Sequence, residues 1–226
     1  MPAYELTPDS FRQRPDVTRA VANPRSPRSV LNYLCGCNTS KPEIRESLNQ
    51  DETVRPLMTI WFQSGRTLDA FCQPFAPVVR ELKSDLPSLT GEDWDSLDGT
   101  AAKVLLADQL SRSCFRGSAE AFSYDPIARD LMRTLMAPQI IDSTLTLPAA
   151  ILYLLPWAFA HSEDVADLDL ACDFVDLAIG AYLNFGLFAE RNKPAIDQHR
   201  QVLKKFGRYP QRNAEFGRET TAAEKA

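Results

Sequence analysis

The stretch from Thr146 to Asp164 places the strongest constraint on the fold. It reads TLPAAILYLLPWAFAHSED, with a proline suited to the first helical turn, an almost unbroken apolar run and an abrupt polar end. A helix that crosses a bilayer needs about 20 apolar residues, so this shorter run indicates a helix buried in a protein core and no membrane partner. The polar residues that close it begin near the interior, where they need partners. We therefore expect a site at His161, Glu163 and Asp164.

The rest of the chain predicts an all-α fold. Apolar residues recur at three- and four-residue spacing in several segments, and no segment shows the sustained alternation of a strand. We expect a multi-helix bundle of packed helical hairpins, with about seven or eight helices. The clearest helices are expected over residues 101–114, 125–136, 163–183 and 194–206, with a central helix from 148 that Pro156 bends.

Three helix ends carry recognisable signals. Asp125 stands before a proline, which is the pattern of an N-cap followed by the first helical residue. Ser162 suits the N-cap of a helix that begins at Glu163, and Gly207 suits a C-terminal cap. These signals also supply a purely structural explanation for several of the polar residues.

The chain divides into a helical domain and two less regular ends. Residues 1–50 are expected to form an N-terminal arm or extension that is partly ordered, residues 51–218 the helical domain, and residues 219–226 a flexible tail. Residues 1–28 are rich in Pro, Arg and Asp and lack periodicity, so we expect an extended arm or a disordered tail there. Tyr4, Leu6 and Phe11 are the side chains that could dock it.

Composition and motifs narrow the functional classes. A net charge of −5 argues against a general nucleic-acid binder, and the first 28 residues hold no signal-like apolar run. Five cysteines, an odd number without framework spacing, favour a reducing cytoplasmic compartment. Two histidines and a lone Cys35-Gly36-Cys37 give no complete metal set, and no nucleotide, cofactor or hydrolase motif occurs. We expect neither metal nor cofactor.

A polar row on one predicted helix is the first candidate for chemistry. Asp108, Arg112 and Arg116 follow one another at intervals of four, so Asp108 and Arg112 can pair along the helix face. Asp108 also continues an apolar row of Ala101, Val104 and Leu105, where a carboxylate is costly unless an arginine neutralises it. A solvated intrahelical ion pair and a pocket-lining pair are the two interpretations left open.

Two histidines are the other candidates. His161 stands beside the carboxylates of Glu163 and Asp164, a combination that suits general acid–base work, although a turn before a capped helix explains it equally. His199 lies on the last predicted helix, where a hydrogen-bonded core residue is the alternative to a catalytic role. Between Arg191 and Arg218 there are eight Lys or Arg against two Asp or Glu, which could neutralise acidic helix starts or bind an anion.

Four blocks of sequence, in order, resemble the signature blocks of the DUF924 family. They are TIWFQSGRTLDAFC, LLADQLSRSCFRG, LYLLPWAFAHSED, and HRQVLKKFGRYPQRN followed by FGR. The resemblance runs from about Val54 to Glu224, and four ordered blocks make it more specific than any single motif. It implies an all-helical, tetratricopeptide-like fold in a family without an assigned function. The matching positions are Asp108, Gln109, Arg112, Phe115, Arg116, Gly117, His161, Ser162, Glu163, Asp164, His199, Phe206, Gly207, Arg208, Pro210, Arg212, Asn213, Gly217 and Arg218.

The chain departs from the family pattern at three polar positions. The family usually reads DQFPRN, and here Ser111 replaces the proline and Ser113 the asparagine. Gln211 stands where the family pattern FPHRN has its histidine. These departures indicate a diverged member with an altered pocket.

The leading functional hypothesis is a small-molecule pocket between helices. It would serve a cofactor-free isomerase, lyase or cyclase that holds an apolar substrate in a reactive conformation with acid–base or hydrogen-bond assistance. The expected catalytic residues are His161, Asp108, Glu163 and His199, and the expected substrate-binding residues are Arg112, Arg116, Trp157, Arg208, Arg212 and Asn213.

A different class of function stays open beside it. A tetratricopeptide-like scaffold could bind a protein or peptide without catalysis, because ion pairs and helix caps explain most of the motif residues. A protein partner and a homodimer are both compatible with the sequence. A nucleic-acid partner is disfavoured, since the cationic segment has few interleaved aromatic residues.

Overall fold

The computed structural model describes residues 6–84 and 88–225 of the chain, and within them every regular element is a helix. The all-α prediction is therefore confirmed. The α-helical segments are α1 (Pro8–Arg12), α2 (Pro15–Ala22), α3 (Pro27–Cys35), α4 (Pro42–Ser47), α5 (Asp51–Gln63), α6 (Ala76–Glu81), α7 (Leu97–Leu105), α8 (Ser111–Cys114), α9 (Asp125–Leu135), α10 (Ile141–Thr144), α11 (Ala149–Leu154), α12 (Trp157–Ala160), α13 (Val165–Ala181) and α14 (Lys193–Phe206).

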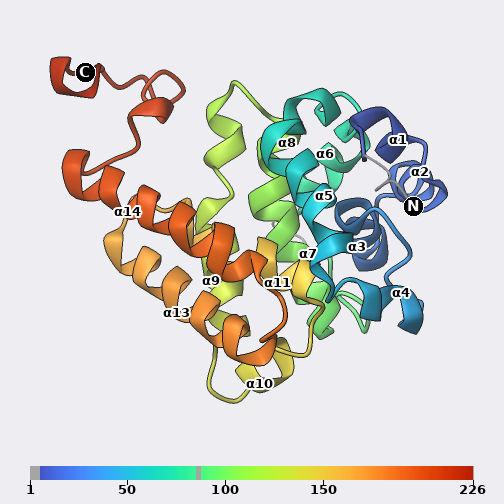
Figure 1. Ribbon diagram of the computed structural model, residues 1–226. Helices are drawn as coiled ribbons and strands as arrows, with labels where there is room; N and C mark the ends of the chain where they lie inside the picture. Colours follow the sequence, from blue (N-terminus) through green and yellow to red (C-terminus); the bar gives the residue numbers. More distant parts are fainter. Residues whose placement is uncertain (1–5, 85–87, 226) are drawn as a thin grey trace.

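The helices pack in succession across the molecule (Figure 1). Helix α2 packs on α3, α3 on α7, α7 on α9, α9 on α12, α12 on α13 and α13 on α14. The antiparallel pair α13 and α14 forms one end, α1 to α3 form the other, and the C-terminal segment leaves the far end of α14. The tetratricopeptide-like arrangement implied by the resemblance stays a prediction.

The described chain has more helical segments than the seven or eight expected, because several predicted helices are interrupted. The helix expected over residues 101–114 contains a π-helical turn at Leu106–Leu110 that separates α7 from α8. A second π-helical turn, Phe188–Asn192, leads into α14. Pro156 separates α11 from α12, since proline cannot donate the backbone hydrogen bond that would continue the helix.

The central apolar run is buried as expected. Every residue from 147 to 160 is buried, and side chains on all faces of α11 and α12 belong to the main hydrophobic core. The run ends at His161, which is the C-cap of α12. The first residue beyond the core is therefore the imidazole that the sequence singled out.

The prediction of an extended or disordered segment over residues 1–28 is wrong for the described part of it. Helices α1 and α2 lie within it, each with a proline in its first turn, and Thr7 forms a capping box with Ser10. Phe11 docks as expected: its side chain is fully buried, with ring centroids 5.9 Å from Tyr33 and 5.5 Å from Trp61. Short helices lack a long periodic pattern, which is why sequence periodicity missed them. Tyr4 lies outside the described residues.

Of the three predicted helix ends, one is confirmed and two are corrected. Gly207 caps α14 in the left-handed region, with φ of 69°. Helix α9 starts at Asp125 itself without a side-chain cap, because that carboxylate binds arginines instead. Helix α13 starts at Val165, and its N-cap is Asp164, which accepts a hydrogen bond from the backbone N–H of Ala166. The division into an N-terminal extension, a helical domain and a tail stays a prediction.

Candidate functional site

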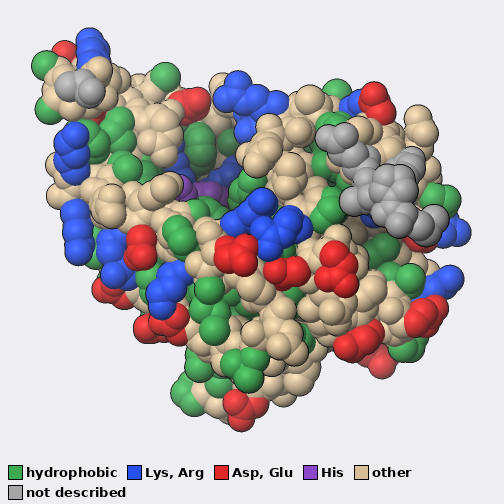
Figure 2. All heavy atoms as spheres, viewed as in Figure 1, with side chains coloured by type: hydrophobic (Ala, Val, Ile, Leu, Met, Phe, Trp, Pro, Cys, Tyr) green, Lys and Arg blue, Asp and Glu red, His purple; other side chains and the backbone are tan. Residues whose placement is uncertain are grey.

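A cavity of about 320 Å³ opens at the polar end of the central apolar run. Three segments far apart in the sequence form its walls: the start of α9, the turn between α12 and α13, and the chain after α14. In Figure 2, histidine side chains lie in a hollow of the surface with lysine or arginine side chains beside them. The lining residues are Phe122, Asp125, Pro126, Arg129, His161, Ser162, Glu163, Asp164, Arg212 and Phe216.

The innermost contact of this site joins His161 to Asp108. The imidazole Nδ1 lies 2.7 Å from Oδ1 of Asp108, whose side chain is 1% exposed, while the His161 side chain is 17% exposed and lines the cavity. Asp108 belongs to the π-helical turn and faces the core, as its place on the apolar row predicted. A buried carboxylate thus binds Nδ1 of the imidazole on the side of the core.

Arg112 determines how this pair is charged. Its guanidinium lies 3.0 Å from Asp108, which confirms the predicted pairing along the helix. Burial alone would raise the pKa of Asp108, but Arg112 and His161 outweigh it and hold that pKa at about 2. Burial and the nearby Arg112 lower the pKa of His161 to about 4 and outweigh the attraction of Asp108. The low pKa of Asp108 is partly due to a positively charged His161, whereas the low pKa of His161 means that the imidazole is neutral at pH 7. We take the neutral imidazole as the state of His161, because Arg112 already balances the charge of Asp108.

The protonation state fixes the tautomer of His161. An ionised Asp108 only accepts hydrogen bonds, so a neutral His161 must carry its proton on Nδ1 and donate it to Oδ1. Nε2 then has a free lone pair, and no hydrogen bond to it is found within the described residues. This arrangement, in which a carboxylate orients a neutral imidazole, is typical of a general base.

A second carboxylate extends the ion network along the cavity wall. Asp125 lies 2.9 Å from Arg112 and 3.4 Å from Arg212. Burial raises the pKa of Asp125, and burial together with the nearby Arg112 lowers the pKa of Arg212. The guanidinium of Arg212 also lies 4.8 Å from the ring centroids of Phe122 and of Tyr209. Two carboxylates therefore face two arginines around one neutral imidazole.

Glu163 holds the chain after α14 against the cavity. Its carboxylate lies 2.8 Å from Arg218 and accepts a hydrogen bond of 2.9 Å from the backbone N–H of Tyr209. The Tyr209 hydroxyl donates to the backbone carbonyl of Ala160 at 2.7 Å, which ties the same segment to the end of α12. Glu163 was predicted to be catalytic, and in this structure its oxygens are engaged in holding the wall.

His199 adjoins the site without lining the cavity. Its Nδ1 lies 3.1 Å from the carbonyl oxygen of Ala160, and burial lowers its pKa. Its ring centroid is 6.1 Å from that of His161 and 5.6 Å from that of Trp157. The ring of Trp157 also packs at 5.6 Å from His161, so Trp157 supports both imidazoles from the core side.

The structure brings together only part of the predicted site. His161, Asp108, Arg112, Arg212 and Glu163 converge as expected, with His199 and Trp157 beside them. Their functional roles stay predictions.

Three of the predicted substrate-binding residues lie elsewhere. Arg116 forms an ion pair with Asp69, because the π-helical turn and the end of α8 carry it off the face that Asp108 occupies. Arg208 pairs with Glu224 at 2.7 Å. Asn213 is buried, and its backbone carbonyl accepts a hydrogen bond of 2.8 Å from the backbone N–H of Arg218, so it shapes the C-terminal turn.

Sequence reasoning missed Asp125, which was interpreted as a helix cap. Phe122, Phe216 and Arg129 were missed as well, and they complete the cavity wall. The spacing of Asp125 gave no sign of the two arginines, since one comes from α8 and the other from the chain after α14. The one signal in the sequence was the excess of Lys and Arg between residues 191 and 218, which indicated that some of them neutralise carboxylates elsewhere in the chain.

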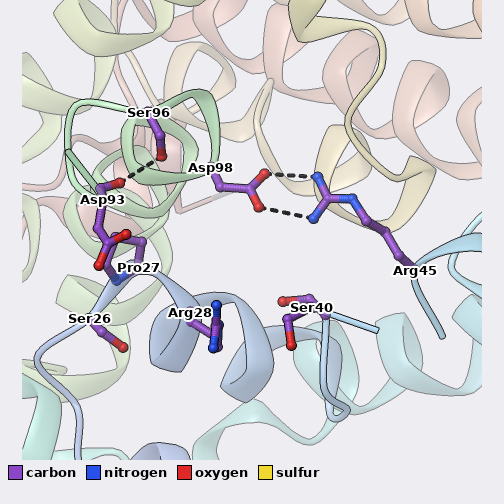
Figure 3. Close-up of a pocket in the computed structure, with 9 residues that line it drawn as sticks. Ser26, Pro27, Arg28, Ser40, Arg45, Asp93, Ser96 and Asp98 are labelled. Carbon is purple, nitrogen blue, oxygen red and sulfur yellow. Dashed lines mark hydrogen bonds and ion pairs between the residues drawn. The ribbon is translucent and has the colours of Figure 1, made fainter. Parts of the chain in front are cut away.

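A larger cavity, of about 480 Å³, lies among polar residues of the N-terminal part and shares no lining residue with the His161 cavity (Figure 3). Arg45 and Asp98 form a two-pronged ion pair across it, with distances of 2.8 and 3.0 Å. Its charged side chains largely satisfy one another or face solvent. It therefore offers less for chemistry than the His161 cavity.

Among the described residues, no group of three or more His, Cys, Asp or Glu side chains is placed to hold a metal ion. No helix in that part of the chain has the length and apolar character needed to cross a bilayer.

Comparison with known proteins places the chain in a family. The pattern of DUF924, described as bacterial protein of unknown function, matches residues 49–226. The chain belongs to the DUF924 family. A similar solved structure is that of the protein of unknown function ATU0120 from Agrobacterium tumefaciens, at 28% identity and a TM-score of 0.55, covering 73% of this chain and 85% of that one. No curated protein matches.

Removal of the Arg112 charge should be strongly destabilising. Arg112→Gln would leave Asp108 and Asp125 buried without their shared cation, and breaking a buried pair in this way costs about 3–5 kcal/mol. Arg116→Gln is the matched control, because Arg116 is 39% exposed and a surface pair contributes less than about 1 kcal/mol. Urea unfolding followed by circular dichroism measures both. Equal losses for the two variants would contradict the assigned network.

The stability of the protein should fall as pH drops from 6.5 towards 4. In this window the unfolded chain protonates His161 while the folded protein, in which its pKa is about 4, keeps it neutral. The full contribution is present above pH 6.5, and the loss should be on the order of 1–3 kcal/mol. Asp108 adds its own loss only below about pH 4, as its lowered pKa is approached. Urea midpoints at several pH values should show a shallower slope for His161→Gln, and parallel slopes would contradict the neutral imidazole.

Proposed function

We propose that this DUF924 protein is a cofactor-independent enzyme that moves a proton on a small molecule, as an isomerase, lyase or cyclase does. His161 acts as the general base through Nε2, Asp108 orients the imidazole, and the cavity of about 320 Å³ holds the substrate. The observation that carries the proposal is the hydrogen bond between His161 and a buried, arginine-balanced Asp108 at the wall of a cavity. Such pairs raise rates by about 10²–10⁴-fold through general base catalysis.

The lining of the cavity indicates the kind of substrate. Phe122, Phe216 and Pro126 supply an apolar surface for the body of the molecule. Arg212 lines the cavity, and its ion pair with Asp125, at 3.4 Å, is longer than that of Arg112 with Asp125, at 2.9 Å. Arg212 is therefore the donor best placed to bind a substrate oxygen that gains negative charge. A carbon acid fits this description: a carbonyl compound whose neighbouring C–H loses a proton to form an enolate.

His199 and Glu163 have supporting roles in this proposal. His199 is bonded to the backbone of α12 and packs against the other imidazole, so it positions His161 without meeting the substrate. Glu163 holds the C-terminal wall through Arg218 and Tyr209. The cytoplasmic location, a protein partner and a homodimer stay predictions from the sequence.

Deuterium exchange tests the proposal without knowledge of the natural substrate. Wild-type protein in D₂O is incubated with a panel of small carbon acids that carry apolar bodies, such as 2-keto acids, β-keto esters and enones, and proton NMR follows exchange at carbon. At least one compound should exchange faster than in buffer, and His161→Gln should reduce that rate by about 10²–10⁴-fold. Arg116→Gln, whose ion pair with Asp69 lies away from the cavity, is the matched control and should exchange as wild type does. His199→Gln should lose less than His161→Gln, because His199 acts only through the position of His161.

The scaffold hypothesis predicts a different result. If the polar network serves only to hold the helices together, compounds whose binding is detected by a thermal shift would show no deuterium exchange above that in buffer. Equal exchange rates for wild type and His161→Gln would likewise contradict the proposal.

A further inference from the structure

A third cavity lies beside Trp157. It measures about 310 Å³ and is formed by α5, α11, α12, the π-helical turn Phe188–Asn192 and the start of α14. It shares no lining residue with the His161 cavity, and the proposed chemistry does not account for it. The lining residues are Met58, Phe62, Gln63, Tyr153, Trp157, Arg191 and Ala195.

Aromatic rings form most of its wall. The Phe62 ring lies 5.9 Å from that of Tyr153 and 5.1 Å from that of Trp157, measured between centroids. Phe62 is 44% exposed although it sits among these rings, and Tyr153 and Trp157 are buried. An exposed phenylalanine beside two buried aromatic residues gives a flat apolar molecule a surface on which to stack.

Three hydrogen-bond donors of this wall lack acceptors in the described part of the chain. The indole Nε1 of Trp157 is buried and has no partner. The hydroxyl of Tyr153 and the guanidinium of Arg191 likewise form no hydrogen bond or ion pair with any described residue. Of the three, only the Trp157 Nε1 is a buried atom without an acceptor, which costs about 1–3 kcal/mol that a bound acceptor would recover.

The donors and rings together specify a class of ligand. Arg191 is the only one of the seven lining residues with a formal charge, so the cavity favours an anion. Its guanidinium can bind both oxygens of a carboxylate, and Tyr153 and Trp157 offer further donors. We propose that this cavity binds a small carboxylate with a flat aromatic or apolar body, separately from the chemistry at His161.

Isothermal titration calorimetry with 2-naphthoate tests this site directly. Wild-type protein should bind the probe saturably, with one molecule per chain. Arg191→Gln should weaken binding by about 10-fold or more, because a charge-assisted hydrogen bond is lost, and Phe62→Ala should weaken it through the lost stacking surface. Tyr153→Phe and Trp157→Phe keep the rings and remove one donor each, and at least one of them should weaken binding several-fold.

Controls separate this site from general effects and from the proposed enzyme. Lys204→Gln removes an equally charged side chain from the last turn of α14 and should leave the affinity unchanged. The neutral probe 2-naphthalenemethanol should bind wild type and Arg191→Gln alike. His161→Gln should bind 2-naphthoate as wild type does, so failure of the proton-transfer proposal would leave this result intact. No saturable binding, or equal affinity in wild type, Arg191→Gln and Phe62→Ala, would overturn the inference.

Discussion

The ion pair between Asp108 and Arg112 is the interaction on which the rest of the site depends. A carboxylate with a side chain 1% exposed stays ionised mainly because a guanidinium lies 3.0 Å away. The ionised Asp108 can then accept a hydrogen bond from Nδ1 of His161, which leaves Nε2 without a partner among the described residues. Without Arg112, Asp108 would take up a proton or the helix would shift, and His161 would lose its orientation. Stability and the proposed chemistry thus rest on the same three side chains.

The fold brings these side chains together through elements of different kinds. The buried run of α11 and α12 ends at His161, so the imidazole stands at the boundary between core and cavity. The π-helical turn carries Asp108 on the side of the core. The chain after α14 returns to the end of α12, where Tyr209 donates to Ala160 and Arg212 reaches Asp125. Figure 1 shows this last segment on the opposite side of the molecule from the N-terminal helices.

The sequence was informative where one side chain has one role and less so where roles compete. The buried central helix and the Asp108–Arg112 pair follow from periodicity and spacing within a single helix, and the bend predicted at Pro156 is a full break between α11 and α12. Asp125 has the local signal of a helix cap, yet two arginines from distant segments occupy its carboxylate. Arg116 and Arg208 were grouped with the site by charge and family pattern, but each has a nearer carboxylate elsewhere. Local patterns cannot encode such long-range competition for partners.

The tautomer and pKa of His161 test the central claim most directly. Nitrogen-15 NMR of protein labelled in histidine, with His161→Gln used to assign the two imidazoles, reports both properties. The account predicts a neutral imidazole with its proton on Nδ1 at pH 7 and a pKa of about 4. A pKa near the ordinary value of 6.5, or a proton on Nε2 at neutral pH, would contradict it.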